Sequence, residues 1–569
     1  MESYYFDNII VQFVIGYFVI KLLVKATIGF LDLLNNGFNF RKQLGNIAFK
    51  VPFLRRMYKK EYNKLLDEFK TKAKERWLKF GPLTKAMPKK GWSLDRINQF
   101  IDLVSEQTND PLNNLSMSGT VYSMNNFELR KVTDRSLSNV YSVAYERSYL
   151  WNPLHHKEFA VGDWLSYQAV HMVGDMFGAN HNEIMGFINS GGSESLMVAI
   201  RSYVNWGYTE KGTKEGQAVI IAPDTIHASV IKAEQAYKCK IVLVPTDSRG
   251  KVYMRDVEKY VKKYKSRVVA LFGSAPNYPN GNVDPIESMA LLALRYKIGM
   301  HVDCCLGAWI INYSGEFDTN FLDYPGVTSL SADNHKNGQA PKGISTLVTR
   351  PMSFNTVGEN LARYSIYTVP DWKGGVYGSP KDQGSHPATS LFAFLSMATI
   401  GDDEYRAIAN KVIQETNELA MRLEEMNFEI LTENPINVVA FKLDDKLNLG
   451  FGATYAFAYE IQQRGIVLNT LKGDAVHFCV TPNAAQSENF VNNFISLAKE
   501  SLEAVIEIKK SGEKFKGDAG MYCDLESAIE PKRSSLSIMK YIENYLFGTR
   551  MASDALRAHF TALLDPYAK

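Results

Sequence analysis

Cysteine is scarce in this sequence. Among 569 residues there are five cysteines, and two of them, Cys304 and Cys305, are adjacent. So few cysteines build no disulfide framework, and their spacing does not match that of a zinc site. We therefore predict no bound metal, and we expect the catalytic part of the chain to work in a reducing compartment.

A strong charge of one sign is also missing. The 64 Lys and Arg residues nearly balance the 61 Asp and Glu residues, which leaves a formal net charge of +3. Proteins that bind nucleic acid usually carry a strong basic field, so we expect no nucleic-acid partner. The length and the hydrophobic fraction of 46% are ordinary for a globular protein of two or more domains.

The hydrophobic N-terminus falls short of the ~20 uninterrupted apolar residues that a spanning helix needs. An uncharged run from Asn8 to Ile20 is followed by Lys21, and apolar residues then resume up to Lys25. Both lysines can extend toward one membrane interface, so residues 1–45 are predicted to form a spanning anchor. The alternative is an amphipathic helix that lies on a membrane surface or on a dimer partner. Basic residues follow the segment, which predicts a single-pass topology with a cytosolic catalytic part.

Further along the chain, the hydrophobic pattern divides into three parts. Residues 46–110 are predicted to be a helical segment, whose basic face is either solvated or attracted to anionic lipid. In residues 111–375, strand-like runs alternate with helical runs, which predicts a mostly parallel sheet covered by helices. In residues 376–569, a long helical pattern and further strands predict a smaller α+β domain. The strand-like runs are 218–221, 241–244, 268–272, 299–302 and 344–349 in the first of these two parts, and 428–431, 438–443, 466–469 and 476–480 in the second.

Two motifs in the central part suit the binding of a phosphate and a ring nitrogen. Gly191-Gly192-Ser193 precedes a helical pattern, and a glycine turn that opens a helix offers backbone N–H groups to a phosphate. An ordinary capped turn would give the same pattern. Asp303 ends a strand-like run, which is the edge where open α/β sheets bind ligands, although a turn aspartate is the simpler interpretation.

Two more residues complete the pattern. Lys336 follows His335 after a strand-like run, and a lysine that forms a Schiff base needs a depressed pKa, which burial supplies. His227 follows another strand-like run and is placed to stack on a ring; a structural histidine is the alternative. Each signal is weak alone. The order of phosphate turn, histidine, aspartate and lysine predicts an enzyme that holds pyridoxal 5'-phosphate.

In this constellation the chain resembles the group II PLP-dependent decarboxylases of fold type I, and within them the lyases of phosphorylated sphingoid bases. The resemblance extends over about residues 85 to 520. It implies an α/β fold of the PLP-dependent transferase-like type, with a mostly parallel sheet, a smaller C-terminal α+β domain and an N-terminal hydrophobic helix. The further segments that carry it are Lys90–Ser93, Ser118–Tyr122, Asn152–His155, Gly273–Pro279, Ala340–Gly343 and Asp371–Pro380.

The resemblance also assigns roles to single residues. It implies that Lys336 forms the Schiff base, that Asp303 pairs with the pyridine nitrogen and that His227 stacks on the ring. Around the cofactor phosphate it places Gly192, Ser193 and His335, together with Ser379 from the partner subunit of a homodimer whose active sites lie at the subunit interface. For the substrate phosphate or the reacting carbon it implies Tyr122, His155 and Lys342. Two positions depart from the family pattern: Asn337 stands where tyrosine is expected, and His386 where arginine is expected.

The reaction that the resemblance implies is a carbon–carbon cleavage in sphingolipid catabolism. The C2–C3 bond of a phosphorylated sphingoid base would break to give a long-chain aldehyde and ethanolamine phosphate. A membrane anchor suits a substrate whose tail lies in the bilayer, and in a eukaryotic cell the expected membrane is the endoplasmic reticulum. The alternatives are an amino-acid decarboxylase, a membrane-anchored transferase of the serine palmitoyltransferase type, and an inactive scaffold that binds the cofactor.

Overall fold

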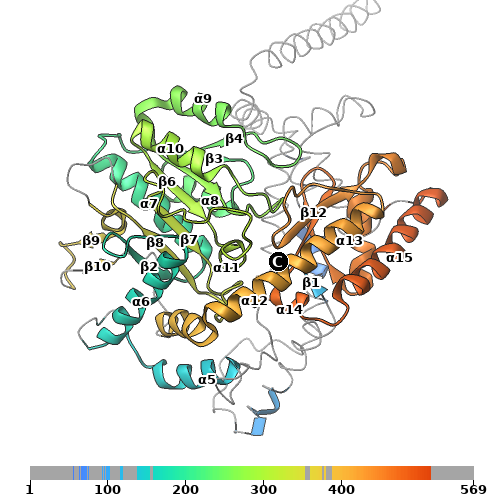
Figure 1. Ribbon diagram of the computed structural model, residues 1–569, viewed down its shortest axis with the longest axis horizontal. Coiled ribbons are helices and arrows are strands. Elements are labelled where there is room, and N and C mark those ends of the chain that lie inside the picture. Colours follow the sequence, from blue (N-terminus) through green and yellow to red (C-terminus); the bar gives the residue numbers. More distant parts are fainter. Residues whose placement is uncertain are drawn as a thin grey trace, which may run out of the picture. The chain divides into compact units, whose positions relative to one another are not determined.

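A computed structural model gives the fold of most of the chain (Figure 1). It describes residues 137–153, 155, 158–352, 359–374, 377–379, 388–513 and 515, together with 116–119 and scattered positions between 56 and 102. The chain divides into two units, Met1–Phe100 with Gly520–Lys569, and Ile101–Ala519; every element named below belongs to the second. The predicted anchor, residues 1–45, lies outside the described residues. Among the described helices, none is both long enough and apolar enough to cross a bilayer.

A seven-stranded sheet forms the centre of the second unit, with the order β2-β8-β7-β6-β5-β3-β4. Neighbouring strands from β4 to β7 are parallel, whereas β8 is antiparallel to both β7 and β2. The sheet is thus mixed but mostly parallel, which confirms the predicted α/β class. The strands are β2 (Met185–Asn189), β3 (Val219–Pro223), β4 (Lys240–Val244), β5 (Val268–Ser274), β6 (Gly299–Asp303), β7 (Ser329–Ala332) and β8 (Ser345–Thr349).

Helices cover both faces of this sheet, because its strands are apolar on both sides. All five residues of β3 and all seven of β5 are buried, as expected for parallel strands that lie between two layers. A Cβ on Gly299 would touch the ring of Tyr203 in helix α7 (Gly192–Thr209), whereas one on Gly273 would touch Ile286 of helix α10 (Ile286–Tyr296). Gly273 pairs with Val302, which points to the face opposite Gly299, so α7 and α10 lie on opposite faces.

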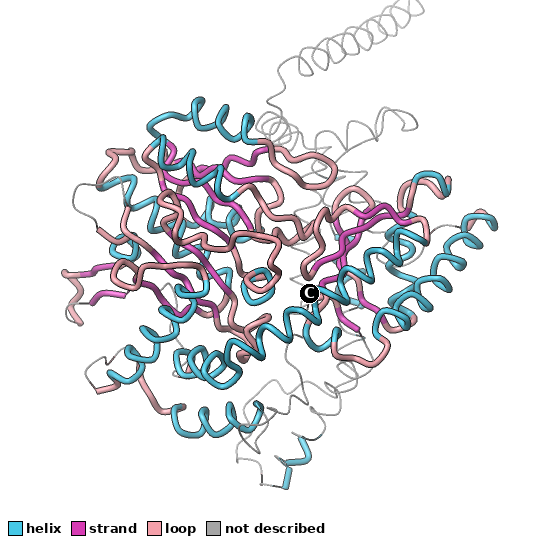
Figure 2. The backbone as a smooth tube through the Cα atoms, viewed as in Figure 1, coloured by secondary structure: helices cyan, strands magenta, loops and turns pink. Residues whose placement is uncertain are grey.

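The C-terminal strands form a second, smaller group, visible as a separate set of magenta segments in Figure 2. This four-stranded antiparallel sheet has the order β11-β12-β15-β14, and two helices, α13 and α15, pack beside it. A short parallel pair, β1 with β13, brings Ser118 to this sheet, where its hydroxyl accepts from the amide of Cys479 at 2.9 Å. The strands are β1 (Ser116–Met117), β11 (Phe428–Ile430), β12 (Val438–Leu443), β13 (Ile466–Val467), β14 (Asn469–Leu471) and β15 (Ala475–Cys479).

A long helix, α12 (Thr389–Glu425), contacts both sheets. At Gly401 its backbone has φ 76° and ψ 167°, so it is two helices joined at a kink. The division into domains at 45, 110 and 375 stays a prediction. The remaining helices are α5 (Leu137–Ser148), α6 (Ala160–Met176), α8 (Ala228–Ala236), α9 (Met254–Tyr264), α11 (Ala308–Ile311), α13 (Ala453–Gln463), α14 (Pro482–Ala485) and α15 (Phe490–Ser511), with short 3-10 turns at Lys265–Arg267, Leu361–Ser365 and Asp445–Leu447.

Candidate active site

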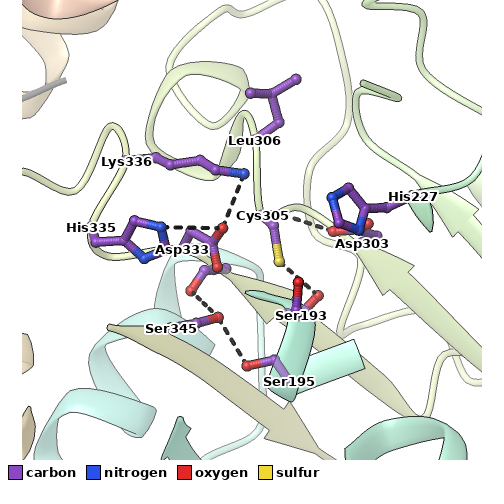
Figure 3. Close-up of polar contacts among 12 residues, drawn as sticks. Ser193, Ser195, His227, Asp303, Cys305, Leu306, Asp333, His335, Lys336 and Ser345 are labelled. Atoms are coloured by element: carbon purple, nitrogen blue, oxygen red, sulfur yellow. Dashed lines mark hydrogen bonds and ion pairs between the residues drawn. The ribbon is translucent and has the colours of Figure 1, made fainter. Parts of the chain in front are cut away.

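The predicted cofactor residues meet at the carboxyl edge of the large sheet (Figure 3). Asp303 is the last residue of β6, and the turn that carries Lys336 follows β7. Gly192 follows β2, and His227 follows β3. In an open α/β sheet, side chains at the carboxyl ends of parallel strands converge on one cleft, which is why residues far apart in the sequence gather here.

The glycine turn opens α7 as predicted. Gly191 has φ 128°, a conformation that favours glycine, and the helix begins at Gly192. Glu194 stabilises the turn, since its Oε2 accepts from the amide of Ser190 at 2.7 Å and from the hydroxyl of Ser190 at 2.8 Å. The hydroxyl of Ser193 accepts from that of Ser229 at 2.7 Å. Because amides in the first turn of a helix have no acceptor within the helix, this turn is suited to bind an anion.

Figure 3 shows His227, which lies in the loop after β3, and Asp303, which is the last residue of β6. His227 is the N-cap of α8, and its Nδ1 accepts from the amide of Ser229 at 3.2 Å. Asp303 is 7% exposed, and its Oδ1 accepts from the amide of Cys305 at 3.0 Å. Asp303 lies close enough to Lys336 for its charge to act on the pKa of that lysine.

Lys336 pairs with a carboxylate that the sequence analysis did not single out. Its Nζ lies 3.0 Å from Oδ2 of Asp333, whose side chain is 3% exposed. Burial is the largest single influence on the pKa of Lys336 and lowers it. Asp333, Cys305 and Asp303 together outweigh burial and raise that pKa well above its usual value. The expectation of a depressed lysine pKa is therefore wrong for this structure, because it took account of desolvation and not of the counter-ion.

His335 is fixed against the backbone beside this pair. Its amide and its Nδ1 both donate to the carbonyl oxygen of Ile344, at 3.1 and 2.7 Å. Its Nε2 lies 3.9 Å from Oδ2 of Asp333. Burial lowers the pKa of His335, while Asp333 opposes that shift. Because Nδ1 donates to Ile344, Nε2 can donate to an anion only when the imidazole is protonated.

The residues predicted for the substrate are only partly assembled. Lys342 lies on a loop near the site, and its pKa is lowered. Partial burial of its amine is the main cause, and the nearby charge of Lys336 is the second. His155 lies on an exposed turn before α6, with its Nδ1 3.9 Å from Glu158, and no contact among the described residues joins it to Lys336. Ser379 lies on strand β10 (Tyr377–Ser379), which pairs with β9 (Tyr367–Val369) outside the large sheet. Tyr122 and His386 lie outside the described residues.

Two further residues beside the site were given no role by the sequence analysis. The buried Cys305 places its Sγ 3.2 Å from the hydroxyl of Ser331, and the buried Asn337 donates from Nδ2 to the carbonyl oxygen of Leu306 at 2.7 Å. The sequence did carry a signal for Asp333. It directly follows an apolar run and stands three residues before Lys336, a spacing at which the two side chains can pair. For Cys305 and Asn337 the sequence carried no comparable signal.

The residues present fit pyridoxal phosphate. A Cβ on Gly192 would lie 2.7 and 2.8 Å from the Asp333 carboxylate oxygens and 2.9 Å from the Cys305 sulfur, so only glycine keeps the turn open at this point. The turn offers amides to a phosphate, Asp303 offers a carboxylate to a ring nitrogen, and Lys336 offers an amine to an aldehyde.

Comparisons with known proteins agree with this assignment. Residues 163–444 match the conserved domain of pyridoxal-dependent decarboxylases. Sphingosine-1-phosphate lyase of Dictyostelium discoideum is 32% identical over 369 residues, which cover 64% of this chain and 65% of that protein. Sphingosine-1-phosphate lyase 1 of Rattus norvegicus is 28% identical over 515 residues, which cover 87% of this chain and 82% of that protein.

A solved structure shows the same fold. The sphingosine-1-phosphate lyase of Burkholderia pseudomallei superposes with a TM-score of 0.66 at 24% identity, over 80% of this chain and 99% of that one. This chain spans just under two thirds of the length of the Dictyostelium relative. The family resemblance drawn from the sequence is confirmed: residues 163–444 of this chain carry the conserved domain of the pyridoxal-dependent decarboxylases, whose cofactor is pyridoxal phosphate.

Proposed function

We propose that this protein is a sphingosine-1-phosphate lyase, which cleaves the C2–C3 bond of phosphorylated sphingoid bases to a long-chain aldehyde and ethanolamine phosphate. The observation that carries the proposal is the name shared by its relatives from the slime mould, the rat and Burkholderia. The geometry adds support. Lys342 supplies a second cation near Lys336, and the group that it suits is the phosphate of the substrate.

Each residue of the cofactor site has a separate proposed role in this reaction. Gly192, Ser193 and His335 would hold the cofactor phosphate, His227 would stack on the ring, and Asp303 would pair with the ring nitrogen. When bound, pyridoxal phosphate supplies an electron-poor ring that accepts the electron pair of the breaking bond. Lys336 carries the amine that binds the cofactor and that can return a proton to the product.

The substrate site is proposed to combine Lys342 with Tyr122 and His155. Lys342 would bind the substrate phosphate as a point charge. Two separate sets of donors, one for each phosphate, keep the cofactor and the substrate from exchanging places. His155 is exposed in the single chain, so its part in the site requires either the partner subunit or residues of the turn that lie outside the described ones.

One assay separates the lyase from its alternatives. Purified protein with pyridoxal phosphate is incubated with sphingosine 1-phosphate, with unphosphorylated sphingosine and with a mixture of amino acids, and both aldehyde and carbon dioxide are measured. We expect aldehyde from the phosphorylated base alone. Carbon dioxide from an amino acid would identify a decarboxylase, and equal turnover of sphingosine and its phosphate would overturn the lyase proposal.

We also propose a homodimer with active sites at the subunit interface. Helices α5 and α6 expose a group of large apolar side chains, and the β9–β10 hairpin exposes others. Arg201, on the same helix as the glycine turn, stabilises the hairpin: it donates to the carbonyl oxygen of Ser365 at 2.7 Å and stacks on the ring of Tyr367 at 4.0 Å. In this proposal the hairpin carries Ser379 to the cofactor phosphate of the partner. The exposed side chains are Tyr145, Tyr149, Leu150, Val161, Trp164, Ile366, Tyr367, Val369 and Trp372.

The mass of the protein in solution tests the dimer. Light scattering after size-exclusion chromatography should give twice the 64.1 kDa of the chain. Trp164→Glu, which places a charge among the exposed apolar side chains, should shift the protein toward the monomer. A parent protein that is monomeric at assay concentration and fully active would contradict a shared active site.

The membrane anchor is proposed for residues 1–45, with the catalytic part in the cytosol and, in a eukaryotic cell, at the endoplasmic reticulum. Deleting residues 1–45 should yield a soluble protein that keeps its activity, because every motif lies downstream. Fractionation of cells that express either form is the test. If the deleted form still sediments with membranes, another surface anchors it, and if the full chain is already soluble, the spanning helix is excluded.

A further inference from the structure

Asp333 occupies a position that the proposed reaction does not use. It directly follows β7 and is 2% exposed, and its Oδ2 lies 3.0 Å from Nζ of Lys336. Its other oxygen, Oδ1, is fully buried and has no hydrogen-bond partner among the described residues. A buried oxygen without a partner is costly, so the position of this carboxylate requires an explanation beyond the ion pair.

The same carboxylate borders the glycine turn. Both of its oxygens would lie within 2.8 Å of a Cβ on Gly192, which opens α7 and is predicted to bind the cofactor phosphate. An anion bound at this turn therefore comes close to a carboxylate that is already buried. Like charges at such a distance favour the neutral form of the carboxyl group.

While the pair persists, Lys336 is charged. Burial opposes both shifts. Asp333, with smaller contributions from Cys305 and Asp303, raises the pKa of Lys336. Lys336, together with His335 and Ser345, holds the pKa of Asp333 below its usual value. An ammonium group has no lone pair and cannot attack an aldehyde. The ion pair that positions Lys336 therefore also makes it unreactive.

We propose that Asp333 keeps Lys336 protonated in the cofactor-free protein, and that a phosphate group bound at the Gly192 turn transfers this proton from Lys336 to Asp333. The proton leaves Nζ and joins Oδ2 across the 3.0 Å contact, so the pair neither gains nor loses a proton. Nζ regains its lone pair and can attack an aldehyde carbon, and the condensation releases one water molecule. Asp333 is thus a positioning residue that acts through Lys336.

This arrangement would make Lys336 react selectively with aldehydes that carry a phosphate, beyond any difference in their binding affinity. An aldehyde that carries a phosphate would activate the lysine that it reacts with, whereas an aldehyde without phosphate would meet a charged amine. The inference goes beyond the proposed lyase reaction, since it depends only on binding of the cofactor. It therefore holds or fails independently of the identity of the substrate.

The test separates the aldehyde from the phosphate. Cofactor-free protein is incubated at pH 7.5 with saturating pyridoxal, which lacks the phosphate, in the presence or absence of inorganic phosphate. Adducts are reduced with borohydride, and labelling of Lys336 is followed over time by mass spectrometry of peptides. For the parent we expect slow labelling by pyridoxal alone and at least tenfold faster labelling with phosphate. Sulfate should accelerate labelling equally, because a dianion at the turn is the requirement.

The variant Asp333→Asn keeps the size of the side chain and removes its charge. Pyridoxal alone should label this variant as fast as it labels the parent with phosphate, and added phosphate should change the rate less than twofold. The matched control is Asp284→Asn, which alters another buried carboxylate, one that accepts from the amide of Ser274 and does not pair with Lys336. That control should keep the acceleration by phosphate.

Two results would overturn the proposal. The first is a parent protein that pyridoxal labels at the same rate with and without phosphate. The second is an Asp333→Asn variant that keeps the full acceleration, since phosphate would then act only by improving the binding of pyridoxal. If the variant does not fold, the parent alone decides: phosphate should move the pH profile of labelling downward by at least one pH unit, and an unmoved profile rejects the idea.

Discussion

The side chain of Asn337 joins the two loops that carry the lysine and the aspartate of the site. Its Nδ2 donates to the carbonyl oxygen of Leu306 at 2.7 Å, three residues beyond Asp303, and it directly follows Lys336 in the chain. The family pattern predicts tyrosine at this position. In this chain, a buried amide takes the place of a ring and fixes the distance between the loops through one hydrogen bond.

Asn337→Ala should destabilise the protein by about 1–3 kcal/mol, because the buried carbonyl of Leu306 loses its short hydrogen bond and keeps only the 3.5 Å one from Nδ2 of Asn437. Urea unfolding of the parent and the variant measures this difference. Asn417→Ala is the control: Asn417 also donates to a backbone carbonyl, that of Ile413 at 2.9 Å, but it is exposed on α12. If the two variants lose similar amounts of unfolding free energy, the hydrogen bond between the loops contributes no more than an exposed one.

Gly192→Ala tests the glycine turn. The added methyl would lie within 2.8 Å of the Asp333 carboxylate, so we expect cofactor binding to weaken on the order of tenfold, equivalent to about 1.4 kcal/mol. Titration of the cofactor-free protein with pyridoxal phosphate, followed by absorbance, is the measurement. On α6, Gly162→Ala places its methyl where nothing lies within 4 Å. That control should bind the cofactor normally and should be more stable by about 0.5–1 kcal/mol.

Gly401→Ala tests the kink in α12. With φ 76° and ψ 167°, Gly401 occupies a region of backbone conformation that only glycine adopts readily. There is open space around a Cβ at this position, so any cost comes from the backbone alone. We expect a loss of about 1–3 kcal/mol in the free energy of unfolding. A stabilised variant would mean that α12 can straighten without disturbing either sheet.

We predict that the buried His477 makes the free energy of unfolding depend on pH. Burial lowers its pKa to about 4, while its Nδ1 donates to the carbonyl oxygen of Pro279 at 3.0 Å. Below pH 6.5 the unfolded chain takes up a proton that the folded chain refuses, so stability falls as the pH drops from about 6.5 toward 4. Between pH 7 and 4.5 this group alone accounts for about 2.5 kcal/mol. Urea unfolding of His477→Gln should show a shallower decline, and an equally steep one would assign the effect to other groups.

Lys342→Ala should lower kcat/KM for sphingosine 1-phosphate by roughly tenfold or more, since charge-assisted hydrogen bonds to phosphate are strong. Affinity for pyridoxal phosphate should change little, because the cofactor phosphate is proposed to bind to other residues, Gly192, Ser193 and His335. Lys232→Ala, on the exposed side of α8, should leave both quantities unchanged. Steady-state kinetics and cofactor titration of the parent and the two variants measure these quantities. If both variants lose the same amount of kcat/KM, Lys342 has no specific role in substrate binding.

Much of the scaffold was predictable because its elements carry periodic apolar residues. The run at 218–221 corresponds to β3, the run at 268–272 to β5, and Asp303 stands at the end of β6 as expected. These strands are buried on both sides, so composition alone distinguishes them from their surroundings. The order of glycine turn, histidine, aspartate and lysine identified the cofactor for the same reason: each motif follows its strand directly.

The charge state of the lysine could not be predicted in this way. The sequence places Asp333 three residues before Lys336, but many such pairs are exposed and weak. Only the fold shows that the pair is buried and that Gly192 lies against it. The β9–β10 hairpin escaped prediction as well, because its exposed residues show no apolar alternation toward a core.

Strand β2 has one neighbour in the large sheet, and that neighbour is β8. The glycine turn after β2 is joined to the edge near Lys336 through β8, and Ser195 and Ser345, 150 positions apart, share a hydrogen bond of 2.9 Å. A ribosome that has synthesised the lysine, the aspartate and the glycine turn has therefore not yet produced the strand that unites them. Residue 349 must be translated before β2 can pair within the sheet, so the glycine turn reaches its place beside Lys336 only after the whole sheet has been synthesised.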